Sequence, residues 1–328
     1  MGVSSMRVRI NRFSRWGIRG PIRLSGGRYT FWILLLVLSA VGCRTTPVTE
    51  RRQLLLVPEH EEVALGVAAY RETLGGEALS QNAEANRLVQ RVGQRIARVA
   101  DRPDYEWEFQ LIASPEKNAF CLPGGKVAIY EGILPICQNE AGLAVVMSHE
   151  IAHALARHGG ERMSHEYVTQ GVGTALSYVL KDRETVKRDR ILQAYGVASK
   201  YGFVLPYSRT HESEADHMGL MLMARAGYDP TEAPQFWQRF ATSGQGSQLP
   251  EFLSTHPAGE RRSLELSELL PEALQLYGDV MTRHGKGEAI PVSQAGLAGN
   301  GDSAGGAALV AHQSPVPAHP TGCQHCGP

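Results

Sequence analysis

Cysteine is scarce in this sequence, and no apolar run is long enough for a membrane-spanning helix. The 328 residues include five cysteines, too few for a disulfide-built scaffold of this size. A transmembrane helix needs about 20 consecutive apolar residues. Residues 31–42 supply only 12 and residues 171–180 only ten, so the latter are expected to form a buried helix or a membrane-facing surface. No repeat on the order of 20 to 50 residues is present, which excludes a solenoid.

Basic charge is in surplus only at the beginning of the chain. The formal net charge is zero, yet the first 30 residues hold seven arginines and no acidic residue. Without these arginines, 26 basic residues remain against 33 acidic ones, a net charge of −7. Domains that bind nucleic acid carry a basic surface. We therefore expect no nucleic-acid partner.

The basic start and the apolar residues 31–42 follow the order of a secretory signal peptide. Small residues then lead directly to Cys43, which resembles the lipidation site of a bacterial lipoprotein. The alternative is an uncleaved signal anchor with an ordinary cysteine. A lipidated Cys43 would hold the protein at a membrane and leave its domain in water. The expected location is the periplasmic side of a bacterial envelope membrane, and Arg44 in place of aspartate favours the outer membrane.

Four segments of different composition follow one another along the chain. Residues 1–42 are the expected signal peptide, and residues 43–58 are expected to be a polar tether. The main domain is expected over residues 59–280. Residues 281–328 are expected to be a disordered tail, because the larger part of them, 291–328, is rich in Gly, Ala and Pro and has a single charged side chain.

Apolar spacing in the main domain predicts an α+β fold that is predominantly helical. Steps of three and four residues predict two amphipathic helices. Their apolar stripes are Val63, Val67, Tyr70, Leu74 and then Leu88, Val92, Ile96, Val99. Residues 105–113 alternate apolar and polar side chains, as a half-buried strand does. Two short extended runs around a Pro-Gly-Gly turn complete a small sheet.

The pattern becomes helical after Asn139, which is a suitable N-cap. The first of these helices is expected to end at Gly159 and Gly160. Its apolar stripe is Leu143, Met147, Ile151 and Ala154. Further helices are expected at residues 164–180, 185–202, 211–226, 230–240 and 259–274.

His149 and His153 are four positions apart, so on a helix both imidazoles project from one face and can chelate one metal ion. Glu150 lies about 100° round from His149, where it can act as a general base on a water at that ion. Two imidazoles and a carboxylate base fit Zn²⁺. The alternative is a pair of ordinary surface histidines. Ala156 and Gly159 occupy the places where the H-E-x-x-H-x-x-G-x-x-H pattern needs glycine and histidine, so a third ligand must come from farther along the chain.

Glu212 and Asp216 are also four positions apart on a predicted helix. Glu212 could complete a ligand set of two histidines and a glutamate, and Asp216 could accept a hydrogen bond from a ligand imidazole. Ala215 and Gly219 are small enough to let this helix approach the first one closely. The neighbouring residues expected to point away from the site or to lie at the surface are Glu214, His211 and His217.

Four motifs, in their order along the chain, resemble the HtpX-type and CAAX prenyl protease-type zinc metallopeptidases. They are residues 118–132, the His149-Glu150-x-x-His153 helix, the Glu212-x-x-x-Asp216 helix and residues 254–262. The resemblance covers residues 59–274 and is nearest to the periplasmic lipoproteins and the mitochondrial inner-membrane member of that family. This sequence differs from some relatives because it has neither a pair of transmembrane helices nor a helical-repeat domain.

The resemblance implies a zincin-like domain with a small sheet beside the active-site helix. It implies one Zn²⁺ per chain, with His149, His153 and Glu212 as its ligands and Glu150 as the general base. His256 would lie near the metal, either in its open coordination position or as a donor to the transition state. The alternative for His256 is an ordinary loop histidine.

The activity implied is a zinc-dependent metalloendopeptidase acting on unfolded or misassembled envelope proteins. An extended polypeptide can pair with an exposed strand whatever its sequence. The expected edge strand contains Lys126, Val127, Ala128 and Ile129, with Asn118, Pro123 and Gly124 shaping the approach to it. Charge on the substrate carbonyl would be stabilised by His256, or by Tyr207 or Arg209. The alternative function is a non-enzymatic, zinc-stabilised envelope lipoprotein that acts as an assembly chaperone or scaffold.

Overall fold

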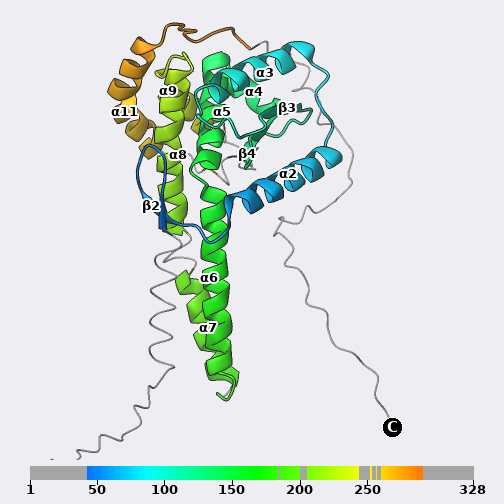
Figure 1. Cartoon of the computed structure of the whole chain (residues 1–328), viewed down its shortest axis with the longest axis vertical. Helices are drawn as coiled ribbons and strands as arrows, with labels where there is room; N and C mark the ends of the chain where they lie inside the picture. Colours follow the sequence, from blue (N-terminus) through cyan, green and yellow to red (C-terminus); the bar gives the residue numbers. More distant parts are fainter. Residues whose placement is uncertain are drawn as a thin grey trace, which may run out of the picture. The chain divides into compact units, whose positions relative to one another are not determined.

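The computed structural model describes residues 43–183, 185–199, 205–243, 252, 256 and 260–290 (Figure 1). The expected signal peptide at residues 1–42 and residues 291–328 of the expected tail lie outside this part. Helices dominate the described residues, which also contain one two-stranded and one three-stranded sheet. The prediction of a predominantly helical α+β fold is confirmed.

The helices follow the predicted periodicity closely. They are α2 (Glu59–Gly76), α3 (Ala83–Ala97), α4 (Leu134–Cys137), α5 (Glu140–Leu155), α6 (His158–Val179), α7 (Thr185–Ser199), α8 (Leu205–Arg225), α9 (Glu232–Thr242) and α11 (Glu260–Asp279), with a 3-10 turn at η1 (Glu131–Ile133). Asn139 caps α5 as predicted, because its side chain accepts a hydrogen bond from the amide of Gly142 at 2.9 Å. None of the described helices has the length and apolar character needed to cross a membrane.

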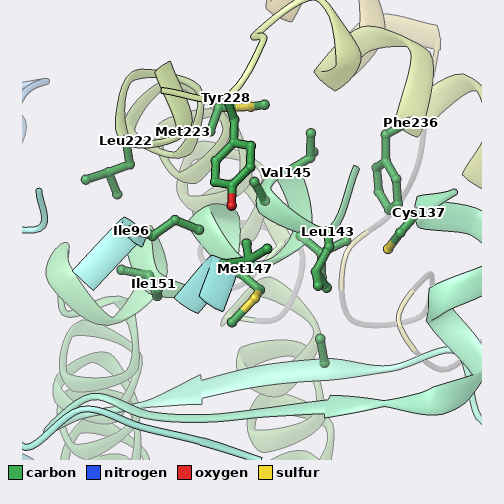
Figure 2. Close-up of a cluster of buried hydrophobic side chains, with 14 of the residues drawn as sticks. Ile96, Cys137, Leu143, Val145, Met147, Ile151, Leu222, Met223, Tyr228 and Phe236 are labelled. Atoms are coloured by element: carbon green, nitrogen blue, oxygen red, sulfur yellow. The ribbon is translucent and has the colours of Figure 1, made fainter. Parts of the chain in front are cut away.

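The core surrounds α5, which is buried almost along its whole length. The predicted stripe of Leu143, Met147, Ile151 and Ala154 is buried, but the other faces of the helix are buried too, because α3, α8, α9 and β4 all pack around it. Figure 2 shows part of this core, with labelled side chains Ile96, Cys137, Leu143, Val145, Met147, Ile151, Leu222, Met223, Tyr228 and Phe236. A central helix of this kind can hold polar side chains in one fixed arrangement.

The three-stranded sheet consists of β3 (Glu108–Ile112), β4 (Ala119–Leu122) and β5 (Lys126–Tyr130). The strand order is β3-β5-β4, with β5 parallel to β3 and antiparallel to β4. The tight turn between β4 and β5 is confirmed, since Gly124 and Gly125 have φ of 90° and 82°, which favour glycine.

The prediction that Lys126, Val127, Ala128 and Ile129 form the sheet edge is wrong. These residues lie in β5, which is hydrogen-bonded to a strand on each side and buried throughout. The turn predicted that β4 and β5 form a hairpin. It could not predict that β3, which is distant in sequence, pairs with the other edge of β5. Among the described strands, β3 and β4 each pair with β5 alone. Residues 78–80 hydrogen-bond to the outer edge of β3, so the outer edge of β4, which packs beside α5, is the one left free in the described part of the sheet.

Residues 43–58 are folded onto the domain, so the prediction of a polar tether is wrong. They contain the antiparallel hairpin of β1 (Cys43–Thr45) and β2 (Arg52–Leu54). Thr46, Gln53, Leu55 and Val57 are all buried. Three polar side chains of the segment, Thr46, Thr49 and Arg51, hydrogen-bond to the buried carboxylate of Glu214, a pairing that composition alone cannot show.

The end of the helix that carries His149 and the end of the domain also differ from the predictions. The helix stop is Arg157, whose φ of 56° is left-handed, whereas Gly159 and Gly160 lie inside α6. The guanidinium of Arg157 is bound to the buried carboxylate of Glu62, which fixes the backbone at that point. Residues 281–290, which were predicted to begin the disordered tail, are part of the domain, because they pair with it through bridges such as Asn139 to Ala289.

Residues 171–179 of the apolar run belong to α6, which Leu180 caps, and many of their side chains are exposed. Val172, Tyr178 and Val179 are solvent-accessible, so the first of the two expectations, a buried helix, is wrong for this segment. The second, a membrane-facing surface, stays a prediction. Figure 1 shows α6 running on from α5 and pairing with α7.

Candidate metal centre

Four metal-ligating side chains converge between α5 and α8. His149 and His153 project from one face of α5, with their Nε2 atoms 3.1 Å apart. Glu212 on α8 places Oε2 of its carboxylate 3.4 Å from Nε2 of His149 and Oε1 3.4 Å from Nε2 of His153. His256 completes the cluster, because its Nδ1 lies 3.0 Å from both oxygens of Glu212 and 3.3 Å from Nε2 of His149. One donor atom from each residue lies within 4.8 Å of the others.

The small residues of α8 allow this convergence. A Cβ at Gly219 would lie 3.0 Å from the amide nitrogen of His149 and 3.1 Å from its Cα. Ala215, one turn earlier, is fully buried. The predicted close approach of the two helices is confirmed, and it is a backbone-to-backbone contact that leaves no room for a larger side chain.

The Nδ1 atom of His149 faces Asp216 at 3.1 Å, as predicted. Asp216 in turn accepts two hydrogen bonds from Arg262, at 2.7 and 2.6 Å. Burial acts to raise the pKa of Asp216, but the charge of Arg262 and the hydrogen bonds hold it below the ordinary value. Asp216 is therefore an ionised acceptor, and the proton of neutral His149 lies on Nδ1.

The Nδ1 atom of His153 faces another imidazole instead of a carboxylate. His158, the first residue of α6, places its Nδ1 2.8 Å from that atom, and its Nε2 lies 3.0 Å from an oxygen of Glu214. His153, His158 and Glu214 thus form a row of hydrogen-bonded side chains, which we call the relay. The prediction that Glu214 points away from the site is therefore wrong, since Glu214 is buried at the far end of the relay. His211, which was expected at the surface, is also buried, and its ring stacks on that of His158 with the ring centres 4.1 Å apart.

The pKa values in the relay favour a neutral His158 beside an ionised Glu214. Burial is the main cause that lowers the pKa of His158 to about 4, so this ring is neutral at pH 7. Burial opposes ionisation of Glu214, but hydrogen bonds from His158, the two threonines Thr46 and Thr49, and Arg51 lower its pKa to about 2. Glu214 is an anion that only accepts hydrogen bonds at neutral pH.

Glu150 lies beside the four donors without being one of them. Its Oε1 is buried, has no hydrogen-bond partner among the described residues and lies 3.5 Å from Nε2 of His256. Burial raises the pKa of Glu150 to about 7. A carboxylate with a pKa near the working pH, placed next to the centre, suits a general base.

The donor set fits one divalent cation. The protons of His149 and His153 lie on their outer nitrogens, so two lone pairs and an ionised carboxylate face one another at 3.1 to 3.4 Å. Such an arrangement is repulsive unless a positive charge lies among the donors. Burial acts to lower the pKa of both imidazoles; hydrogen bonds to Asp216 and Glu212 hold that of His149 above the ordinary value, whereas that of His153 stays well below it. Imidazole nitrogen and carboxylate oxygen are ligands that zinc takes.

Sequence reasoning missed Arg262 and His158. Arg262 is buried, its guanidinium lies 3.5 Å from the centre of the Trp237 ring, and it also approaches Glu212 at 3.2 Å. Its only signal is its place in the motif at residues 254–262. His158 follows His153 by five positions, a spacing that no regular helix brings together; the left-handed Arg157 makes the contact possible.

Other residues singled out in the sequence lie elsewhere. The turn with Pro123 and Gly124 packs on α2, where Gly66 and Val63 contact it. Arg209 is exposed, and the side chain of Tyr207 lies outside the described residues. Cys121 and Cys137 are both free thiols.

Comparison with known proteins places these motifs in one family. The model of peptidase family M48 matches residues 83–270. The mitochondrial metalloendopeptidase OMA1 of Schizosaccharomyces pombe is 37% identical over 260 residues, which cover 78% of this chain and 72% of that protein. The human metalloendopeptidase OMA1 is 30% identical over 264 residues, covering 76% of this chain and 50% of that protein. The beta-barrel assembly-enhancing protease of Escherichia coli is 28% identical over 206 residues, covering 62% and 42%. The chain thus spans half or less of the last two relatives.

Proposed function

The chain belongs to peptidase family M48, and from this premise we propose that it is a zinc-dependent metalloendopeptidase acting on unfolded or misassembled proteins of a bacterial envelope. The observation that carries the proposal is the convergence of His149, His153 and Glu212 from two helices, with Oε1 of Glu150 buried beside them and not hydrogen-bonded to any described residue. A structural site needs no such base. The family is one of metal-dependent peptidases, so the substrates are polypeptides.

The roles of the side chains follow from their positions. His149, His153 and Glu212 would hold one Zn²⁺ per chain, and Asp216 orients His149. When bound, zinc supplies the positive charge that polarises the scissile carbonyl and acidifies a nearby water. Glu150 accepts a proton from the attacking water and delivers it to the leaving amine. Burial raises the pKa of Glu150 above its ordinary value, which helps the carboxylate to take up that proton.

His256 has the geometry of a removable fourth donor. Its Nδ1 lies with the other donor atoms, while its Nε2 faces Glu150 at 3.5 Å. A fourth protein ligand would occupy the coordination position that catalysis needs open. We therefore assign His256 to a closed state, from which it withdraws or turns to donate to the substrate oxyanion. The same four-donor set is the observation that would favour structural zinc in a non-enzymatic scaffold.

The free edge of β4 is the proposed site for the substrate backbone. β4 packs beside α5, which carries Glu150, so a chain added along this edge would lie next to the centre. Backbone pairing gives affinity without demanding a sequence, and a folded protein rarely offers a free extended segment. This supports unfolded or misassembled substrates, as does the name of the Escherichia coli relative, a beta-barrel assembly-enhancing protease.

The proposed location is the periplasmic side of an envelope membrane, with the outer membrane preferred and Cys43 lipidated. The name of the Escherichia coli relative supports an envelope location, as does that of a putative beta-barrel assembly-enhancing protease of Vibrio cholerae to which the chain is also similar. Cys43 is the first residue of β1, so an anchor there would hold the domain directly at the membrane. A Cys43→Ser variant that stays in the membrane fraction would contradict lipid anchoring through this residue.

Glu150→Gln separates the enzyme from the scaffold. The variant should keep one zinc per chain, measured by mass spectrometry, and should cleave casein about 10²- to 10⁴-fold more slowly. Glu166→Gln, the same change on the exposed face of α6, is the matched control and should cleave at the normal rate. Casein cleavage by Glu150→Gln at the normal rate would overturn the assignment.

His256→Ala tests the closed state against structural zinc. A removable donor predicts that the variant stays folded, keeps its zinc and cleaves casein as fast as the parent or faster. Loss of zinc together with loss of the folded state would favour the scaffold function.

A further inference from the structure

The turn of the β1–β2 hairpin is bonded to the carboxylate that supports His153. Thr46 and Thr49 both donate their hydroxyl hydrogens to Oε1 of Glu214, and the Nε of Arg51 donates to Oε2 at 2.8 Å. Thr46 and Glu214 are buried. Glu214 thus has three donors from a segment that is more than 160 residues away in sequence.

Arg51 also braces the opposite side of the same relay. Its two terminal nitrogens donate to Glu161 at 3.0 and 2.6 Å. Glu161 is fully buried and lies 2.9 Å from Nε2 of His211, whose ring is stacked on His158. The imidazole of His158 is therefore held at its edge by Glu214 and on its face by His211, and both of these depend on Arg51.

The hydrogen-bond directions along the relay leave one tautomer for each ring. A carboxylate accepts, so Nε2 of His158 donates to Glu214. Two ring nitrogens 2.8 Å apart need one donor and one acceptor. Ligation through Nε2 of His153 leaves its Nδ1 as the donor, so Nδ1 of His158 is the acceptor. The lone pair of His153 then lies on Nε2, which faces the metal centre. The other tautomer would point an N–H at the cation and prevent ligation.

We propose that Thr46, Thr49 and Arg51 of the N-terminal hairpin are positioning residues of the metal centre, which act through Glu214 and His158 to orient His153. The inference rests on the proposed function, because it assumes that the centre holds a metal ion. The hairpin lies before residues 83–270, the part of the chain that the family model matches.

The relay links the start of the domain to the chemistry. Cys43, the proposed lipid attachment point, is only three residues before Thr46. Removal or displacement of this segment from α6 and α8 would free Glu214 and let His158 turn. The ligand His153 would lose its fixed orientation while His149, held by Asp216, would keep its own.

The experiment compares two double variants of the full chain. Thr46→Val/Thr49→Val removes both donors at constant shape, and Thr46→Ser/Thr49→Ser keeps the hydroxyls. Zinc affinity is measured by competition with a chelating dye, and the site geometry by the d–d absorption of Co²⁺-loaded protein. The valine pair should weaken zinc binding about tenfold and alter the Co²⁺ spectrum, whereas the serine pair should restore both. Thr73→Val/Thr174→Val, which removes two hydroxyls bonded only within their own helices, should change neither.

His158→Phe keeps the proposal testable if the valine pair fails to fold. The phenyl ring retains the stacking on His211 but offers no acceptor to His153, so zinc binding should weaken by about tenfold or more. Zinc affinity and a Co²⁺ spectrum that stay unchanged in a folded valine pair or in His158→Phe would overturn the inference. A parent protein that binds no zinc would overturn the proposed function as well, whereas a parent that binds zinc and cleaves casein isolates the failure to the relay.

Discussion

The two sides of the metal centre hold their histidines in different ways. His149 meets the carboxylate of Asp216 directly, and Asp216 is fixed by Arg262 from α11. His153 reaches Glu214 only through the extra ring of His158, and Glu214 is fixed by the N-terminal hairpin.

Helical geometry explains the difference. Asp216 is four positions after Glu212, so both lie on the face of α8 that meets α5, whereas Glu214 is about 200° round from Glu212. A carboxylate on that other face needs an intermediate donor to reach the ligand. One helix therefore supports both histidines. On the direct side, Asp216 contacts His149 itself; on the relayed side, Glu214 reaches His153 through His158 and depends on more segments of the chain.

Arg262→Met should have the largest effect on stability, because it removes the ion pair with Asp216 on the direct side. The change leaves Asp216 buried without its cation, which costs about 3–5 kcal/mol in the free energy of unfolding. Arg51→Met on the relayed side should cost less, since Arg51 is partly exposed. Urea denaturation of the metal-free protein measures both, and an equal or larger loss for Arg51→Met would contradict the comparison.

Asp216→Asn should weaken zinc binding by about 10- to 100-fold, because the amide no longer offers His149 a charged acceptor. Glu214→Gln should have a smaller effect, since its influence passes through His158. Dye competition on the two variants gives the ratio of dissociation constants. A Glu214→Gln variant that binds zinc more weakly than Asp216→Asn would reverse the ranking of the two sides.

Gly219→Ala should destabilise the contact that brings the direct side together. The new methyl would press on the backbone of His149 at 3.0 to 3.1 Å, at a cost of about 1–3 kcal/mol in the free energy of unfolding. Gly171→Ala is the matched control on α6, where no atom lies within 4 Å, and it should be neutral or slightly stabilising. Chemical denaturation distinguishes these outcomes, and equal stability of the two variants would contradict the close approach.

Acid should weaken the relayed side through Glu161. Burial opposes its ionisation, but hydrogen bonds from His211 and Arg51 lower its pKa from 4.5 to about 2 in the folded state. A depressed carboxylate pKa stabilises the fold above the unfolded value and loses that contribution as pH falls towards the folded one. The free energy of unfolding should therefore fall between about pH 4.5 and pH 2, and less steeply in Glu161→Gln. An equally steep fall in the variant would show that Glu161 is not involved.

The sequence sufficed for the parts of the centre that depend on local spacing. The i, i+4 pairs of α5 and α8 and the cap at Asn139 are local, so His149, His153, Glu212 and Asp216 could be placed on their helices in advance. The central position of β5 could not, because strand order is decided by pairing with β3 across the intervening chain.

The relay was hidden for another physical reason. Hydrophobic periodicity detects buried apolar faces, whereas Thr46 and Glu214 are buried as polar partners of each other. Such pairs have no sequence period, and each member alone resembles a solvated residue. The contact between His153 and His158 further requires a left-handed residue at Arg157, which is not glycine and gave no turn signal.

The most direct test of the metal centre is the zinc K-edge X-ray absorption spectrum of the protein loaded with one zinc per chain. A site made by His149, His153, Glu212 and His256 predicts only nitrogen and oxygen neighbours at about 2.0–2.2 Å, with the scattering pattern of imidazole. A sulfur shell at about 2.3 Å would show that cysteine binds the zinc, and would contradict the centre between α5 and α8.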